Sequence, residues 1–302
     1  MTAPDTALAT LFDDVLEAAS PFEGTGLDRD LWQRLSDLGL TTITSAQGGT
    51  WADAVTALRA TAGHGAQVPL AEHDLLANWL RQHAGLPLSE QPSVVMATNE
   101  HSPMDRVAWR DHADHIVVLQ VSNQGATVCE GAAAVSVDPG LTGEYRLRGA
   151  LARSAQISGA MTAAVDMTIR YAGERIQFGR PIAGLQAVQH LVADALAETA
   201  LALTAVDAAA ASADRDGVTA PGTVAAIAAA KSVSSRSATV VVRNTHQVHG
   251  AIGTTAEHPL HRRTASMLSW RNDFGSAVEW ETVIADELVQ PGRTVWSWLS
   301  GW

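Results

Sequence analysis

Hydrophobic residues recur at helical spacing in the N-terminal part of this chain. Residues three and four apart lie on one side of a helix, so such spacing predicts an amphipathic helix. The first predicted hydrophobic face consists of Leu8, Leu11, Phe12, Val15 and Leu16. Similar patterns, separated by turn residues, predict four short helices over residues 7–19, 28–38, 51–61 and 70–83. Asp28 is the expected N-terminal cap of the second helix. Residues 1–88 are therefore predicted to form a small helical domain.

The pattern changes at about residue 93. Short runs rich in β-branched residues follow, and Gly, Asn, Asp and Pro separate them, which is typical of strands joined by turns. These runs are Val94–Ala97, His115–Val121 and Ala126–Cys129. Fewer than about sixty residues can form only a handful of strands of usual length. Residues 89–148 are therefore predicted to form a small, reduced β domain.

Helical spacing returns after Gly149 and continues almost to the end of the chain. We expect the third helix to open near Pro221 and to stop before Gly250. The four predicted helices cover residues 150–174, 185–206, 219–246 and 273–288. Long helices with short connections are typical of an antiparallel bundle. The predicted fold class is mainly α with a small β domain, and residues 149–302 form its C-terminal four-helix bundle.

Composition narrows the possible partners and locations. The chain has 302 residues and a formal net charge of -12, which opposes binding to nucleic acid or to anionic membranes. No apolar segment is long enough to span a bilayer, and the N-terminus does not resemble a secretory signal. Cys129, the single cysteine, excludes an intrachain disulfide and is interpreted as a small apolar residue. We therefore expect a soluble cytoplasmic protein with no nucleic-acid or membrane partner.

Two motifs carry the candidate chemistry. The first, Arg-Ile-Gln-Phe-Gly-Arg-Pro-Ile over residues 175–182, lies between two predicted helices, and Gln186 follows it. The second is Gln-Val-His-Gly-Ala-Ile-Gly over residues 247–253. A guanidinium group can pair with a phosphate through two parallel hydrogen bonds, and a nearby ring can pack against a flat cofactor. The first motif is therefore a candidate dinucleotide clamp. Taken alone, Arg175 also suits a cation at a helix C-terminus followed by a simple turn.

These motifs, together with the order of helical domain, β domain and bundle, resemble the acyl-CoA dehydrogenase family. The resemblance implies FAD as the cofactor, bound across a subunit interface, with these motifs receiving the ADP half of a neighbour's flavin. It implies that Arg175 contacts the pyrophosphate and that Phe178 packs beside the cofactor. It also implies that Gln186 and the backbone of residues 247–251 hold the adenosine side. Ala251 departs from the family, which usually has a second glycine there. The implied cofactor-binding residues are Arg175, Gln177, Phe178, Gln186, Gln247, Val248, His249, Gly250 and Ala251.

The same resemblance leaves the catalytic base unassigned. Acyl-CoA dehydrogenation needs a carboxylate to remove the α-proton while a hydride leaves to the flavin. The family places this Glu either early in the first bundle helix, here near Gly149 and Ala150, or in a turn before the last helix. In the turn over residues 272–276, Phe274 occupies the position of the acid and Asp273 precedes it. Asp273 is the candidate base at this turn, and its alternative role is the N-terminal cap of the last helix.

The β domain is much shortened relative to the family, and only residues 97–100 resemble the start of the family's flavin-binding region. Without a base and a full flavin site, the chain resembles the short non-catalytic subunit of actinobacterial heteromeric, steroid-CoA type acyl-CoA dehydrogenases. The resemblance implies a catalytic partner subunit in an α2β2 heterotetramer, and an acyl-CoA substrate bound mainly by that partner. It further implies electron-transfer flavoprotein or a similar electron acceptor.

Three alternatives stay open at this point. The first is a self-sufficient homo-oligomeric dehydrogenase that uses Asp273 or Glu257 as its base. The second is a metal-binding helical bundle built on His246, His249, Glu257, His258 and His261, although the carboxylate pairs typical of such sites are missing and no metal is expected. The third is an interaction protein without a flavin role, favoured by Trp296, Trp298 and Trp302 because Trp is enriched at interfaces.

Overall fold

A computed structural model describes residues 6–99, 108–123 and 125–289, apart from 21, 23 and 25, and also residue 294. Trp296, Trp298 and Trp302 lie outside these described residues. The chain divides into two compact units. The first contains residues 1–61 and 66–152, and the second contains residues 62–65 and 153–302.

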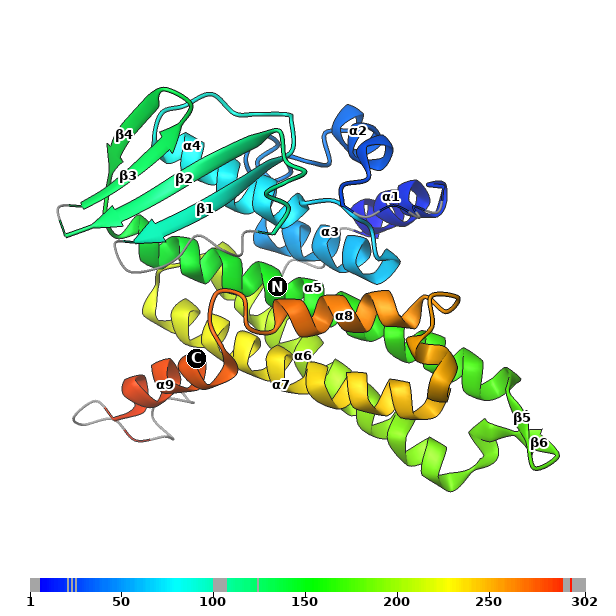
Figure 1. Cartoon of the computed structure of the whole chain (residues 1–302). Helices are drawn as coiled ribbons and strands as arrows, with labels where there is room; N and C mark the ends of the chain where they lie inside the picture. The colour runs from blue at the N-terminus through cyan, green and yellow to red at the C-terminus, as the bar shows by residue number, and fades with distance from the viewer. Residues whose placement is uncertain are drawn as a thin grey trace. The chain divides into compact units, whose positions relative to one another are not determined.

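The first unit begins with short helices close to the predicted spans. They are α1 (Thr6–Glu17), α2 (Arg29–Asp37), α3 (Trp51–His64), η1 (Ala71–Asn78) and α4 (Trp79–His83) (Figure 1). The predicted cap of α2 is confirmed, because the Asp28 carboxylate accepts a hydrogen bond of 3.0 Å from the backbone N–H of Leu31. Apolar side chains such as Phe12, Leu35 and Leu58 are buried among these helices.

One helix differs in kind from the prediction. Residues 71–78 form a π-helix rather than an α-helix, and all eight of these residues are buried. The carboxylate of Asp74 faces the segment before α3 and accepts hydrogen bonds from the backbone and hydroxyl groups of Thr44 and Ser45. Hydrophobic spacing predicts a helix here but cannot distinguish the wider π-turn, because the tertiary contacts of buried polar residues decide it.

A four-stranded sheet completes the first unit, in the order β1-β2-β3-β4. Its strands are β1 (Ser93–Asn99), β2 (His115–Ser122), β3 (Gly125–Glu130) and β4 (Ala133–Val137). β1 and β2 are parallel, and the other neighbours are antiparallel. Val117, Leu119 and Val128 point to one face and are fully buried, and the contacts of η1 with β1 place the π-helix against the sheet (Figure 1). Cys129 on β3 is half-buried.

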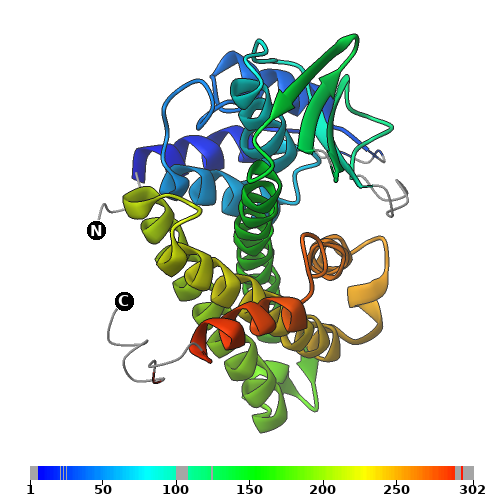
Figure 2. The same ribbon diagram turned by 90° about the vertical axis from the view of Figure 1, so that its left-hand side faces the viewer.

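The second unit is built from long helices. They are α6 (Gln186–Asp216), α7 (Pro221–His249), α8 (Leu260–Trp270), α9 (Ala277–Leu288) and the C-terminal part of α5 (Leu141–Glu174) (Figure 2). α5 starts at Leu141, so the predicted start at Ala150 is wrong. Pro221 at the first turn of α7 and Gly250 at its end are confirmed as helix boundaries.

The fourth helix of the bundle is not the one predicted from sequence. A single apolar core joins α5, α6, α7 and α8, and it includes Met161, Ala202, Val241 and Met267. α8, which was not predicted, therefore completes the bundle, while α9 packs on α7 outside it. The many buried alanines of α6 and α7 allow these two helices to lie close together. Among the described residues, no helix is both long and apolar enough to cross a membrane.

Candidate functional site

The first motif forms a tight hairpin between the two longest helices. After α5 ends at Glu174, β5 (Ile176–Gln177) pairs with β6 (Arg180–Pro181). The connecting residues, Phe178 with φ 52° and Gly179 with φ 77°, both have left-handed backbone conformations. This is the backbone of a type I′ turn, which favours Asn-Gly. Glycine adopts it freely, but Phe does so only at a conformational cost.

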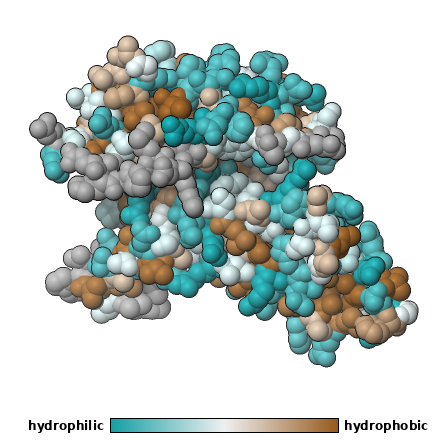
Figure 3. All heavy atoms as spheres, in the orientation of Figure 1, coloured by the Kyte–Doolittle hydropathy of each residue, from teal (hydrophilic) through white to brown (hydrophobic). Residues whose placement is uncertain are grey.

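The side chains of this hairpin are displayed to solvent. Phe178 is 87% exposed and Ile176 is 56% exposed, and Figure 3 shows apolar surface at this end of the molecule. Within the described part of the chain, the Arg175 and Arg180 guanidinium groups form no hydrogen bond or ion pair. Gln177 and Gln186, the latter at the first position of α6, are also exposed. The hairpin therefore presents cationic, amide and aromatic groups that the fold does not use.

The second motif ends α7 and begins a short 3-10 helix, η3 (Gly250–Thr254). Gly250 has φ 64°, and its N–H donates to the carbonyl of His246 to close the helix. Gln247, Gly250 and Ala251 are exposed, whereas Val248 and His249 are only 7% and 4% exposed. The side chains of Val248 and His249 are therefore held in the interior, and these two residues offer only backbone groups to a ligand.

The structure brings the two motifs together. Val248 packs in one apolar cluster with Ala172 at the end of α5 and Ile182 after the hairpin. Tyr171, four residues before Arg175, lies parallel to the His249 ring with centroids 4.5 Å apart. Its hydroxyl donates to the His249 carbonyl at 3.4 Å. The exposed groups of both motifs therefore surround one shared core.

The α8–α9 turn, residues 271–276, shows what Asp273 does. Its carboxylate accepts a hydrogen bond of 2.9 Å from Nε of Arg153, a buried residue of α5. The ring of Phe274 lies 5.7 Å from the same guanidinium group, and Phe274 has φ 58°. The predicted role of Asp273 as the cap of α9 is wrong. Ser276 caps this helix in a reciprocal capping box with Glu279, which is the sequence signature that the prediction missed.

Lys231 holds the same turn from α7. It is the only lysine in the sequence, and it is fully buried. Its ammonium group donates to the carbonyls of Trp270 and Arg271 at 3.1 and 2.7 Å, and to the Ser235 hydroxyl at 3.2 Å. Burial lowers the pKa of Lys231 to about 7, although the nearby charge of Asp273 raises it. The sequence prediction missed Lys231, although a single lysine in a chain with many arginines could have drawn attention to it.

The proposed metal-ligand cluster does not converge. Across the residues that the structure describes, no three or more His, Cys, Asp or Glu side chains are placed to hold a metal ion. Glu257 is exposed. The histidines instead bond to protein groups of the bundle. His246 bonds to the Thr264 hydroxyl, and His249 bonds to the Thr245 carbonyl. His258 accepts from the Leu260 N–H, and His261 bonds to the His258 carbonyl.

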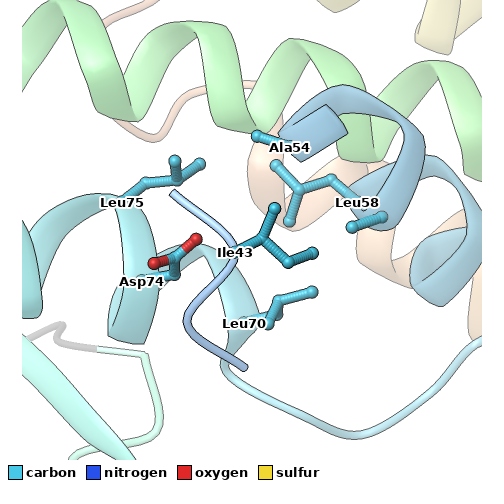
Figure 4. Close-up of a pocket in the computed structure, with 7 residues that line it drawn as sticks. Ile43, Ala54, Leu58, Leu70, Asp74 and Leu75 are labelled. Atoms are coloured by element: carbon cyan, nitrogen blue, oxygen red, sulfur yellow. The ribbon is translucent and has the colours of Figure 1, made fainter. Parts of the chain in front are cut away.

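A small cavity in the first unit is not a substrate site. Its volume is about 10 Å³, roughly the space for one water molecule. Figure 4 shows Ile43, Leu58, Leu70 and the carboxylate of Asp74 around it. The Asp74 carboxylate accepts hydrogen bonds from Thr44 and Ser45, so we interpret the cavity as a gap in the packing.

These features define the chain as a mainly helical protein in which a bundle follows a small sheet and displays two adjoining polar motifs at one corner. Residues 147–276 match the family model described as "Acyl-CoA dehydrogenase, C-terminal domain". This part of the chain is therefore similar to the C-terminal domain of the acyl-CoA dehydrogenases. It is 33% identical over 111 residues to acyl-CoA dehydrogenase IpdE2 of Mycolicibacterium smegmatis, covering 37% of this chain and 33% of that protein. The matched segment thus spans about a third of that relative's length.

Solved structures extend the likeness of fold to almost the whole chain. The ChsE4-ChsE5 complex from Mycobacterium tuberculosis has a chain that superimposes with a TM-score of 0.83 at 21% identity, covering 97% of this chain and 99% of that one. The steroid ACAD Tcur3481-Tcur3483, as a G363A variant, gives a TM-score of 0.81 at 20% identity, covering 93% and 96%. The predicted fold class, mainly helical with a small sheet, is therefore confirmed.

Proposed function

We propose that this chain is the non-catalytic subunit of a heteromeric, FAD-dependent acyl-CoA dehydrogenase and that it completes the flavin site of its partner. The observation that carries the proposal is the corner at residues 175–186, where Arg175, Gln177, Phe178 and Gln186 are all exposed beside the second motif. A guanidinium group without a protein partner suits a pyrophosphate, since charge-assisted hydrogen bonds to phosphate are strong. The exposed ring of Phe178 offers an apolar surface to a flat cofactor.

The residues present fit the ADP half of FAD. Arg175 is the residue for the pyrophosphate, and Gln186, Gln247 and the backbone of residues 250–251 are the groups for the adenosine side. FAD, when bound, supplies the acceptor for the hydride that leaves the acyl chain. The contribution of this chain is to bind and orient the nucleotide half of the cofactor, while the partner holds the reacting half together with the acyl-CoA.

The α8–α9 turn supports the assignment of the catalytic base to the partner subunit. A catalytic base must reach the substrate α-carbon with a free carboxylate. Asp273 instead accepts a hydrogen bond from Arg153, so its carboxylate is held within the fold. Phe274, at the family's position for the acid, has no proton to exchange. The catalytic Glu is therefore assigned to the partner subunit, and electron-transfer flavoprotein or a similar carrier is the expected oxidant.

The titles of the two structural neighbours guide the choice of partner and substrate class. One names a complex of two different chains, and the other names a steroid acyl-CoA dehydrogenase. We propose the same type of assembly here, a heterotetramer of two subunit pairs acting on a CoA thioester with a steroid side chain or a similar bulky acyl group.

Arg175→Ala in the co-expressed complex tests the proposal. We expect wild-type complex to carry about one FAD per subunit pair and the variant to lose most of it, because one charge-assisted bond to phosphate is worth about 1.5–3 kcal/mol, or roughly ten- to hundredfold in affinity. Flavin absorbance per complex after gel filtration measures the change.

Arg215→Ala is the matched control. Arg215 is an exposed arginine near the end of α6 that pairs with its neighbour Asp216, so its loss should leave flavin content unchanged. Unchanged flavin in the Arg175 variant would contradict the clamp. A homo-oligomer of this chain that alone binds one FAD per subunit and oxidises acyl-CoA would contradict the assignment of a non-catalytic subunit.

A further inference from the structure

Three aromatic side chains join the first motif, residues 175–182, to the second motif, residues 247–253. We call these two motifs together the corner. The Tyr171 ring, on α5, stacks on His249 of α7 at an interplanar angle of 18°. The His258 ring, from the loop before α8, meets the edge of the stack, 4.6 Å from His249 and 6.2 Å from Tyr171 between centroids. We name Tyr171, His249 and His258 the aromatic stack. Its members come from three separate segments, and Tyr171 lies one helical turn before Arg175.

The hydrogen bonds fix the protonation of the histidines in this stack. His249 Nδ1 lies 2.9 Å from the Thr245 carbonyl, which only accepts, so Nδ1 carries the proton. His249 Nε2 is then a bare acceptor, and it is buried without a hydrogen-bond partner among the described residues. His258 Nδ1 accepts from the Leu260 N–H at 3.2 Å. Both rings are therefore built into the fold as neutral imidazoles.

Burial, and after it the neighbouring histidines, makes a second proton on either ring of the stack costly. Burial lowers the pKa of His249 and of His258, and mutual repulsion adds to this, from His258 and His246 onto His249 and from His261 onto His258. Burial, followed by the charge of His261, also lowers the pKa of His246. On the other elements, Tyr171 is the member from α5, η3 carries no titratable side chain, and Glu257 beside His258 is exposed.

We propose that the aromatic stack is the positioning element that holds the two motifs together, and that its protonation on mild acidification releases the corner from its binding conformation. This inference rests on the proposed function, since it concerns how the same corner retains FAD. Tyr171, His249 and His258 are positioning residues and need not contact the cofactor. Their role is to keep Arg175 and the backbone of residues 250–251 at a fixed separation.

The direction of the pH effect follows from the lowered pKa values. A loosened corner lets its histidines take up protons near the ordinary value of about 6.5, whereas the packed corner keeps them neutral to lower pH. The packing is therefore fully stable above about pH 6.5 and is lost as the pH falls below it. Because several histidines titrate together, the loss should be steeper than a one-proton curve.

The first test follows FAD released from the co-expressed complex as the pH is lowered from about 7.5 to about 5. In the double variant His249→Phe/His258→Phe, the rings can still stack but no longer titrate. We expect the midpoint of FAD release, measured relative to each protein's own retention at neutral pH, to lie at lower pH in this variant than in wild type. Tyr171→Ala should lose FAD about tenfold faster at neutral pH, comparable to removing one buried aromatic contact.

His190→Gln is the matched control, because His190 is an exposed histidine near the start of α6 and outside the stack. It should leave the pH profile unchanged. The same midpoint in wild type and in the double variant would overturn the proposal.

Hydrogen exchange on this chain, alone or in the complex, separates this inference from the proposed function. Tyr171→Ala should raise exchange in both residues 171–185 and residues 245–262, with no flavin needed for the readout. Raised exchange with unchanged FAD content would support the positioning role and contradict the flavin role. Unchanged exchange in both segments would contradict the positioning role, even if the complex lost FAD.

Discussion

Two parts of the molecule concentrate polar side chains and treat them in opposite ways. In the first unit, the π-helix and the residues after it bury His73, Asp74, Asn78 and Arg81, all less than 4% exposed. At the corner of the second unit, Arg175 and its neighbours are exposed. The first set has protein partners on nearly every side, whereas the Arg175 guanidinium has none among the described residues. Polar residues that satisfy one another stabilise a fold, and those left exposed are available to a ligand.

The buried set is a continuous network. Arg81 donates to Glu130 through two of its nitrogens, and also to Asn78 and to Ser93. Asn78 in turn donates to His73 and to the Ser89 carbonyl. The network therefore joins the π-helix and α4 to β1 and β3 at one end of the sheet. A π-helix often marks a functional site, but here its Asp74 and Asn78 side chains bond to protein groups.

The largest predicted effect tests this structural assignment. Arg81→Met should destabilise the chain by about 3 kcal/mol, because removing one member of a buried ion pair leaves its partner uncompensated. The midpoint of urea unfolding measures the loss. Arg175→Met is the matched control and should change the free energy of unfolding by less than about 0.5 kcal/mol, as expected at an exposed site. Equal losses in both variants would remove the distinction between the two regions.

Adding Glu130→Gln to the Arg81 variant sharpens the result. If the loss comes from the unpaired carboxylate, the double variant should recover part of the stability. Further destabilisation by the second change would show that Glu130 contributes through other contacts, such as the one with His115 at 3.5 Å.

Lys231 is an intermediate case, buried like the first set but bonded mainly to carbonyls. Its pKa is lowered by burial to about 7, while the unfolded chain has the ordinary value near 10.4. Between these values the unfolded state binds more protons, so the free energy of unfolding should rise with pH by up to about 1.4 kcal/mol per unit. Lys231→Met should abolish this rise, as measured by urea unfolding at about pH 7, 8 and 9.

The assignment of this slope is simple because the chain contains no other lysine and only two tyrosines. A wild-type protein whose stability is flat over this range, or a Met variant with the same slope, would show that Lys231 keeps an ordinary pKa inside the fold. Either result would contradict the interpretation of Lys231 as a buried group with a lowered pKa at the α8–α9 turn.

How much the sequence predicted differs between the same regions. The periodicity of hydrophobic residues predicted most helices and strands correctly. Asp28, Pro221 and Gly250 lie at real helix boundaries, because caps and helix breakers act through local contacts. The π-helix and the replacement of the expected fourth bundle helix by α8 depend on distant partners, which no local pattern reports. The motifs were visible as residue types, but the inward turn of Val248 and His249 depends on packing against Tyr171 and Ile182.

The smallest predicted effect lies at Phe178, where stability and binding should change in opposite directions. Phe178→Asn creates an Asn-Gly pair, the favoured sequence for this left-handed turn, and should raise the free energy of unfolding by up to about 1 kcal/mol. The same change removes the exposed ring and should lower FAD retention in the complex. Leu201→Gln, at another exposed apolar side chain, 54% exposed on α6, should alter neither quantity. A less stable Asn variant would mean that the ring packs within the fold. A more stable variant with full flavin content would mean that the strained ring serves another purpose than holding the cofactor.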